Sequence, residues 1–179
     1  GSGAYLMCPV DSQKQLIGAY SYGIKDEDDW GEVIARMRNI TVHRYDCFSL
    51  DEVTQYDVYD LAVANDEKDD DTLRAFFDSV NNAEARAERG KRFEFDKFAE
   101  GEGGAVFHDE CLVGANMHMG WRRSGTLREH LAANGHSDAP PRSLLLKMDI
   151  DYHEWNVLAS AHVSDLVKFQ QITMEMHHP

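Results

Sequence analysis

The sequence predicts an α/β domain with a mostly parallel β-sheet. The main evidence is the pattern of elements in the N-terminal part of the chain. Residues 14–24, KQLIGAYSYGI, form a short, nearly continuous apolar run closed by glycine, which is typical of a strand buried on both faces. A helical pattern over residues 25–39 and a strand pattern over residues 40–48 follow with short connections. A strand, a helix and a second strand in this order form a βαβ unit, which implies parallel strands.

The helix predicted over residues 25–39 has charges that match the helix dipole. Acidic residues gather at its start, and Arg36 and Arg38 lie near its end. Its apolar residues fall at helical spacing: Trp30, Val33, Ile34 and Met37. The next stretch, ITVHRYDCF, alternates in the manner of a strand, which is expected to end near Asp46.

The C-terminal part of the chain continues the alternation of strands and helices. Three further strands are predicted, over residues 104–114, 142–150 and 169–178. One helix is expected to begin at Thr126, which forms a capping box with Glu129, and to stop at Gly135. Another single helix is predicted over residues 154–167. We expect the five strands in the order 3-2-1-4-5, with helices on both faces.

Residues 51–104 are predicted to lie outside this sheet. They are strongly acidic, with a helical pattern over residues 69–90 and a short strand pattern over residues 91–98. We interpret them as an acidic insertion in a single domain spanning residues 1–179. The plainer alternative is a surface helix with a solvated acidic face.

Composition excludes several classes of partner. The chain has 32 acidic and 18 basic residues and a formal net charge of −14. Such a field repels phosphate groups, so neither nucleic acid nor an anionic membrane surface is an expected partner. No run of residues approaches the roughly 18 apolar residues of a membrane span.

Cysteine usage leaves the compartment undetermined. Cys8, Cys47 and Cys111 are widely spaced, which shows neither a disulfide framework nor a metal knuckle, although one disulfide bridge remains open. The opening Gly1-Ser2-Gly3 resembles an expression scar, so native targeting segments are expected to have been removed.

Chemistry-bearing residues follow each predicted strand. In parallel α/β sheets ligands bind at the carboxyl ends of the strands, where the strand order reverses. The residues at these ends are Gly23, Asp46, His108-Asp109, Asp149 to Glu154, and His177-His178. A glycine allows close approach of a cofactor, and an acidic residue after the second strand can accept hydrogen bonds from a ribose diol. Taken singly, such residues are also ordinary turns and helix caps.

Six of these stretches together resemble a known family. YSYGIKDEDDW, TVHRYDC, FHDECL, TLREHLAANGH, LLLKMDIDYHEWNVL and QQITMEMH occur in the order seen in S-adenosylmethionine-dependent methyltransferase-domain proteins of the methyltransferase-like and FkbM-type groups. In those proteins the fourth strand reads Leu-Lys-Ile-Asp-Ile-Glu-Gly-Ala-Glu-Trp and the fifth ends in Glu-x-His. The resemblance covers most of residues 14–48 and 105–178 and implies a Rossmann-like class I methyltransferase sheet.

The resemblance also implies roles for individual residues. It places Tyr20, Ser21, Tyr22 and Gly23 around the methionine part of S-adenosylmethionine, Asp46 on the ribose hydroxyls, and Asp109 or His108 near the adenine. Asp149 would lie near the sulfonium and the substrate. His153 and His177 are the candidate bases if a hydroxyl is the methyl acceptor.

The chain departs from the family pattern in two places. The family's Glu-Gly-Ala stretch is Asp151-Tyr152-His153 here, so a glycine turn is replaced by bulky residues. The family also closes its sheet with two strands after the fifth, which are expected to be missing from this chain. We therefore predict that residues 170–177 form an open sheet edge, which either pairs with another copy or another chain or has lost native strands that once covered it.

These observations favour a methyltransferase that acts on a hydroxyl oxygen of a small molecule or a glycan-type substrate. Two alternatives remain open. One is a divalent metal site formed by residues at the strand ends, namely Asp149, Asp151, His153, His177 and His178. The other is a non-catalytic binding module that keeps the fold only for interaction.

Overall fold

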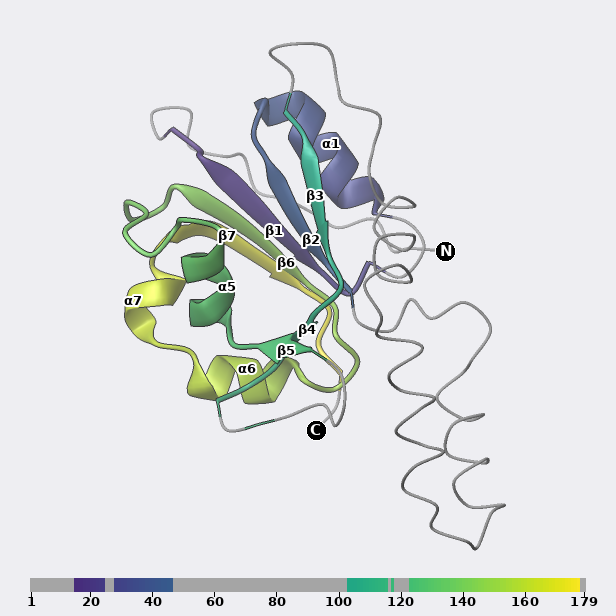
Figure 1. The fold of residues 1–179 in the computed structure, drawn as a ribbon, viewed down its shortest axis with the longest axis vertical. Helices are drawn as coiled ribbons and strands as arrows, with labels where there is room; N and C mark the ends of the chain where they lie inside the picture. The colour runs from purple at the N-terminus through teal and green to yellow at the C-terminus, as the bar shows by residue number, and fades with distance from the viewer. Residues whose placement is uncertain (1–14, 25–27, 47–102, 116, 118–122, 178–179) are drawn as a thin grey trace, which may run out of the picture.

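The structure is a computed structural model that describes residues 15–24, 28–46, 103–115, 117 and 123–177. Within these residues five strands form a parallel sheet in the order β3-β2-β1-β6-β7 (Figure 1). The strands are β1 (Gly18–Tyr22), β2 (Val42–Tyr45), β3 (Ala105–His108), β6 (Leu144–Met148) and β7 (Phe169–Met174). Counted along the chain, these five strands have the order 3-2-1-4-5, so the predicted order is confirmed.

Strand β1 lies at the centre of the sheet. It pairs in parallel with β2 on one side and with β6 on the other, and Tyr22 is level with both Tyr45 and Met148. The predicted parallel pairing of residues 15–23 with residues 144–150 is therefore confirmed. The result is an α/β fold with a parallel sheet, consistent with a Rossmann-like layout.

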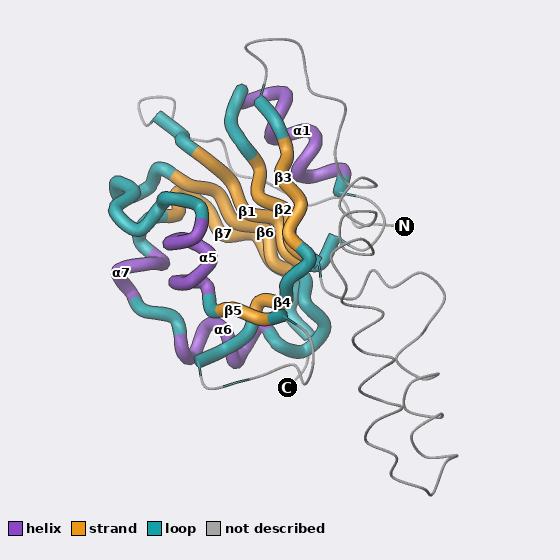
Figure 2. Tube along the Cα trace, viewed as in Figure 1, coloured by secondary structure: helices purple, strands orange, loops and turns teal. Residues whose placement is uncertain are grey.

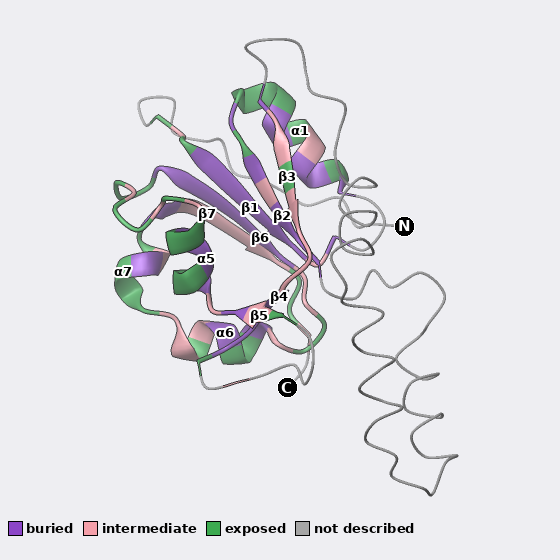
Figure 3. Cartoon of the chain, viewed as in Figure 1, coloured by how far each residue is buried: buried purple, intermediate pink, exposed green. Residues whose placement is uncertain are grey.

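Helices cover both faces of the sheet (Figure 2). Helix α1 (Asp29–Arg38) packs Trp30 and Ile34 against Ala19, Val42 and Leu145 on one face. Helices α5 (Leu127–Ala133), α6 (Glu154–Ser160) and α7 (Val163–Leu166) pack against the other face. Every residue of β1 and β6 is buried, as Figure 3 shows, because both faces of these central strands are covered.

The predicted helix start at Thr126 is confirmed, and α1 begins at Asp29 with an N-cap that sequence reasoning did not identify. The Oδ1 atom of Asp28 accepts a hydrogen bond from the Gly31 amide at 2.9 Å, so Asp28 is the N-cap of α1. The capping box of Thr126 and Glu129 at the start of α5 is present with both of its hydrogen bonds.

The third strand was predicted too long. Strand β3 ends at His108, where the Glu110 amide donates to the His108 carbonyl at 3.0 Å and the chain turns out of the sheet. The next apolar residues form β4 (Cys111–Leu112), which pairs with β5 (Ser124–Gly125) in a separate two-stranded sheet. Leu112 is still part of the hydrophobic core, but it reaches the core from β4 and not from the third strand of the parallel sheet.

The single helix predicted over residues 154–167 is also wrong, because the chain forms two helices. The interruption lies at Ala161 and His162, which have extended backbone. Ser160 turns its hydroxyl back to the Asn156 carbonyl at 2.8 Å, a contact that competes with helix continuation. After the break, Asp165 is buried and pairs with Lys168 at 2.8 Å.

Several predictions fall on residues outside the described ranges. These are the acidic insertion, except for its last residues, the helix over residues 69–90, the strand over residues 91–98, and His178.

Cys111 is disulfide-bonded, so the bridge left open by the sequence is present. Within the described residues, no helix has the length and apolar character needed to cross a membrane.

The ion pair of Asp28 with Arg44 is the buried charge pair beneath α1. Arg44 Nε lies 2.9 Å from Asp28 Oδ2, and both side chains are only 2% exposed. We predict that Arg44→Met lowers the free energy of unfolding by about 3–5 kcal/mol, because it leaves a buried carboxylate without its cation. The same substitution at Arg36, in an exposed pair with Glu32, should cost under about 1 kcal/mol. Urea unfolding of both variants measures the difference, and equal losses would contradict the prediction.

Strand β7 is an edge of the sheet within the described residues. Pairing with a second copy through residues 170–177 stays a prediction. We expect sedimentation velocity to show a dimer at high protein concentration, because an edge strand can pair with a strand of a second copy. Substituting Ile172 by lysine should shift the sedimentation coefficient toward the monomer, and a wild-type monomer at all concentrations would rule the pairing out.

Candidate functional site at the carboxyl ends of the strands

The carboxyl ends of β1 and β6 meet at the point where the strand order reverses. Gly23 follows β1 with a φ of +71°, and a Cβ atom there would lie 1.5 Å from the Asp149 carbonyl oxygen. Glycine is therefore required by the packing of one backbone on the other. The Asp149 amide donates to the Tyr22 carbonyl at 3.2 Å and continues the pairing past the strand ends. This junction is where ligands bind in sheets of this topology.

Lys147 joins the same two strand ends from inside the sheet. Its ammonium group donates to the carbonyls of Tyr22 (3.1 Å) and Gly23 (2.8 Å), and it lies 3.8 Å from Asp149 Oδ2. Burial lowers the pKa of Lys147, while Asp149 acts in the opposite direction. Sequence reasoning missed this residue, although a lysine within the apolar run LLLKM was a visible signal.

The polar residues on the α1 face are engaged with one another. Ser21 donates to Asp28 Oδ1 at 3.0 Å, and Arg44 NH2 donates to the Asp28 carbonyl at 2.8 Å. Burial lowers the pKa of Arg44, and Asp28 opposes that shift. Asp46 is only 4% exposed at the end of β2. Ser21 and Asp46, both predicted to bind the cofactor, thus lie in the interior of this structure.

Tyr20 and Tyr22 point to the opposite face, toward α5. There they belong to a group that we call the His–Tyr cluster, formed by Tyr20, Tyr22, His43, Tyr45, His108, His130 and His136. The Tyr20 hydroxyl lies 2.7 Å from His136 Nδ1, and the Tyr22 hydroxyl lies 3.2 Å from His130 Nδ1. Both tyrosines are fully buried, so their hydroxyls are committed within the core.

The rings of the His–Tyr cluster stack on one another. Tyr45 stacks on His108 at 4.3 Å and on His130 at 4.2 Å between ring centroids, and its hydroxyl accepts a hydrogen bond from Asn134 at 2.7 Å. His43 Nδ1 lies 3.2 Å from His108 Nε2, so one of the two nitrogens must carry a proton and the other must accept it. Two charged imidazoles at this distance would repel each other.

Burial keeps two histidines of this cluster, His43 and His108, neutral at physiological pH. It lowers the pKa of His43 to about 3 and that of His108 to about 4, with neighbouring histidines adding to both shifts. Burial also raises the pKa of Tyr45 to about 12. His108, which sequence reasoning placed near an adenine, is therefore a neutral, stacked side chain. Asp109 follows it, half-buried, at the exit from β3.

The structure brings Asp149, Asp151 and His177 together. One ligand atom from each of these side chains lies within 4.8 Å of the other two. His177 Nε2 is 3.7 Å from Asp151 Oδ1, and His177 Nδ1 is 3.0 Å from Glu154 Oε1. The hydrogen bond with Glu154 raises the pKa of His177. We call these three residues, with Glu154 behind them, the Asp–His cluster.

The loop that carries Asp151 has an unusual backbone. Asp151 and Tyr152 have φ angles of +46° and +73°, in the left-handed region that favours glycine. The resembling family has glycine at the position of Tyr152, so this chain keeps the turn without the residue that makes it easy. The Tyr152 ring lies 5.1 Å from the His177 ring and is largely exposed. Strained residues of this kind concentrate at functional sites.

His153 does not join the Asp–His cluster. It lies at the N-cap position of α6 without a side-chain capping hydrogen bond, and its buried Nδ1 atom has no hydrogen-bond partner within the described residues. Glu154, which sequence reasoning placed at a strand end and at the start of a helix without a specific role, is fully buried and contacts His177. Its acidic character in an amphipathic helix gave no sign of that burial.

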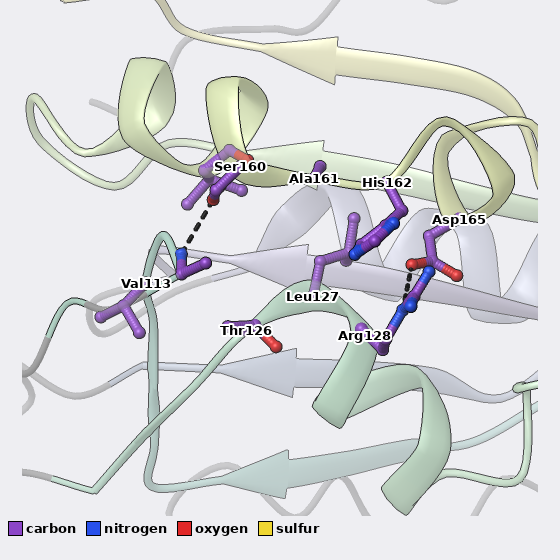
Figure 4. A pocket seen from close by; sticks show the side chains of 10 residues that line it. Val113, Thr126, Leu127, Arg128, Ser160, Ala161, His162 and Asp165 are labelled. Atoms are coloured by element: carbon purple, nitrogen blue, oxygen red, sulfur yellow. Dashed lines mark hydrogen bonds and ion pairs between the residues drawn. The ribbon is translucent and has the colours of Figure 1, made fainter.

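A separate cavity lies between α5, α6 and α7 (Figure 4). Its volume is about 100 Å³, and the ion pair of Arg128 with Asp165, at 2.8 Å, closes one side. Thr126, Ser160 and His162 also line it. Sites for cofactors of nucleoside size span roughly 300–1,000 Å³, so this cavity does not hold one.

Comparisons with known proteins neither support nor contradict the resemblance to methyltransferase-domain proteins. The chain matches no protein-family model, no curated protein and no solved structure.

We predict that protonation of the His–Tyr cluster destabilises the fold. The pKa values of His43 and His108 are depressed in the folded state. Their contribution to the free energy of unfolding is therefore complete above the ordinary pKa of 6.5 and is lost as the pH falls toward about 4. In His43→Phe the unfolding free energy should fall less steeply over this window, because one uncharged imidazole is gone. Urea unfolding at several pH values measures the slope. His162→Phe, at an exposed position, serves as the control, and equal slopes in both variants and the wild type would refute the prediction.

Proposed function

We propose that this chain is an S-adenosylmethionine-dependent methyltransferase acting on a hydroxyl oxygen of a small molecule or glycan-type substrate. The observation that carries the proposal is the junction of β1 and β6, where the required glycine at position 23 meets Asp149 at the reversal of the strand order. The motif resemblance predicts a cofactor at this place, and the parallel sheet in the order 3-2-1-4-5 is the topology that such a site needs.

The charge of the site fits a cationic cofactor. Asp149, Asp151 and Glu175 place carboxylates around the strand ends, within reach of His177. S-adenosylmethionine carries a positive sulfonium and a positive ammonium group, which carboxylates attract. In this proposal Asp149 faces the reacting end, and Asp46 and Asp109 bind the nucleoside part.

The bound cofactor would supply a methyl group already activated by its sulfonium. In the transfer, the acceptor oxygen forms a bond to the methyl carbon while the carbon–sulfur bond breaks and its electron pair stays on sulfur. The protein mainly supplies proximity and orientation. The hydroxyl proton must leave, and His177 is the better placed candidate base, because Glu154 contacts its Nδ1 and its Nε2 faces the site.

A non-catalytic binding module is the second candidate. Internal hydrogen bonds occupy the hydroxyl groups of Tyr20, Ser21 and Tyr22, and Asp46 is buried. Tyr152 also occupies the place of the family's turn glycine. A domain that keeps the sheet and has lost the cofactor would show the same features.

Binding of S-adenosylhomocysteine distinguishes these two functions. At a hundredfold excess over its dissociation constant the ligand should add about 2.7 kcal/mol to the unfolding free energy, which appears as a raised melting temperature. Asp46→Asn should weaken binding by roughly 1.5–3 kcal/mol through loss of a charge-assisted hydrogen bond. Asp138→Asn, an exposed aspartate elsewhere, is the matched control. No thermal shift and no heat of binding at millimolar ligand would reject methyl transfer and leave the binding module.

A further inference from the structure

The Asp–His cluster combines the side chains that metals prefer. Asp149 and Asp151 come from the loop after β6, and His177 comes from the segment after β7. Within the described residues, this is the group of three histidine, cysteine or acidic side chains whose ligand atoms converge. Two carboxylates and one imidazole suit divalent transition metals, with Mn²⁺ favoured by the carboxylates.

The distances in the cluster fit ligands around an ion better than hydrogen bonds. His177 Nε2 lies 3.7 Å from Asp151 Oδ1 and 3.8 Å from Glu175 Oε1. A hydrogen bond to a ring nitrogen spans about 2.7–3.2 Å, so both separations are too long. Two ligand atoms that each lie about 2.1 Å from one ion are about 3.0 Å apart in octahedral and about 3.4 Å apart in tetrahedral coordination, so the side chains would move closer together on binding an ion.

Glu154 provides an independent observation that points to a metal. Its side chain is 0% exposed, and its Oε1 atom lies 3.0 Å from His177 Nδ1 and accepts from the Ile150 amide at 3.0 Å. The other oxygen, Oε2, is buried without a hydrogen-bond partner within the described residues. A carboxylate on one ring nitrogen keeps the proton there and leaves the lone pair of Nε2 toward Asp151. Metal-bound histidines are oriented in this way.

The backbone of His177 is also held in place. Its carbonyl accepts a hydrogen bond from the Trp155 indole at 2.7 Å, so ring and backbone are both fixed by α6. Asp151, in contrast, has a side chain that is 52% exposed. An ion held by these three side chains would therefore be accessible to solvent. Such an open site leaves room for water or a substrate oxygen to complete the coordination.

We propose that Asp149, Asp151 and His177 bind one divalent transition-metal ion, with Glu154 as the residue that positions His177. This site goes beyond methyl transfer and does not require it, and His177 cannot act as the base through Nε2 while that nitrogen binds the ion. The ion would lie at the strand ends, beside the junction of β1 and β6.

Titration with Mn²⁺ alone tests the proposal on the full chain after removal of metals with a chelator. The chain has 32 acidic residues, so bulk binding is not sufficient evidence and a local probe is needed. The Trp155 indole N–H is such a probe, because it donates a hydrogen bond to the His177 carbonyl. We expect its NMR signal, assigned with Trp155→Phe, to broaden at substoichiometric Mn²⁺, while electron paramagnetic resonance of free Mn²⁺ gives the dissociation constant.

Variants separate the site from general acidity. Asp151→Asn and His177→Gln should each weaken Mn²⁺ binding at least tenfold, and Glu154→Gln by about 10–100-fold. The exposed residues Asp138 and His162 provide matched controls, since Asp138→Asn and His162→Gln make the same chemical changes elsewhere. Circular dichroism checks folding, and if Glu154→Gln does not fold, the exposed Asp151 still carries the test.

Two results would overturn the site. One is an unbroadened Trp155 signal while Mn²⁺ binds elsewhere or not at all at millimolar concentration. The other is an equal loss of affinity in Asp151→Asn and Asp138→Asn. Because no nucleoside is present, failure here is distinct from failure of the methyltransferase proposal, which depends on S-adenosylhomocysteine binding.

Discussion

The contact between the ends of β1 and β6 fixes the position of everything at the candidate site. The two backbones approach so closely that Gly23 cannot carry a side chain, and Lys147 binds the last carbonyls of β1 from within β6. Asp149 is therefore delivered to the centre of the sheet edge by main-chain geometry and not by a flexible loop. A side chain held in this way has little freedom to lose when it binds a ligand, which favours precise chemistry.

The two faces of the sheet bury polar groups by different means. On the α1 face, opposite charges on Asp28 and Arg44 compensate each other at 2.9 Å. On the α5 face, His43 and His108 of the His–Tyr cluster remain uncharged, because burial holds the pKa of each far below the ordinary value. Buried polar groups are tolerated only when they are paired or neutral, and this domain uses one solution on each face.

Glu154 connects the architecture of the loop after β6 to its chemistry. By accepting from the Ile150 amide it closes the turn in which Asp151 and Tyr152 adopt left-handed backbone. The same oxygen orients His177, which arrives from a different strand. The turn and the Asp–His cluster thus depend on one buried carboxylate, so strain in the backbone and order in the site have a common source.

The sequence by itself determined the sheet. The apolar runs of residues 14–24 and 144–150, separated by helical patterns and short connections, predicted parallel strands in the observed order, because this pattern depends on local periodicity and on the handedness of crossovers. It also predicted the capping box at Thr126 and the gathering of Asp149, Asp151 and His177 at one edge.

Only the tertiary structure decided how those side chains are used. The burial of Glu154 depends on its contact with His177, which is distant along the chain, and periodicity does not record such contacts. The same holds for the tyrosines of β1. Alternation predicts that Tyr20 and Tyr22 share a face, but the partners they meet there, His136 and His130, are supplied by a helix more than a hundred residues later and the loop after it. Local pattern indicates which apolar residues are buried, and packing decides which polar residues join them and what each must bind.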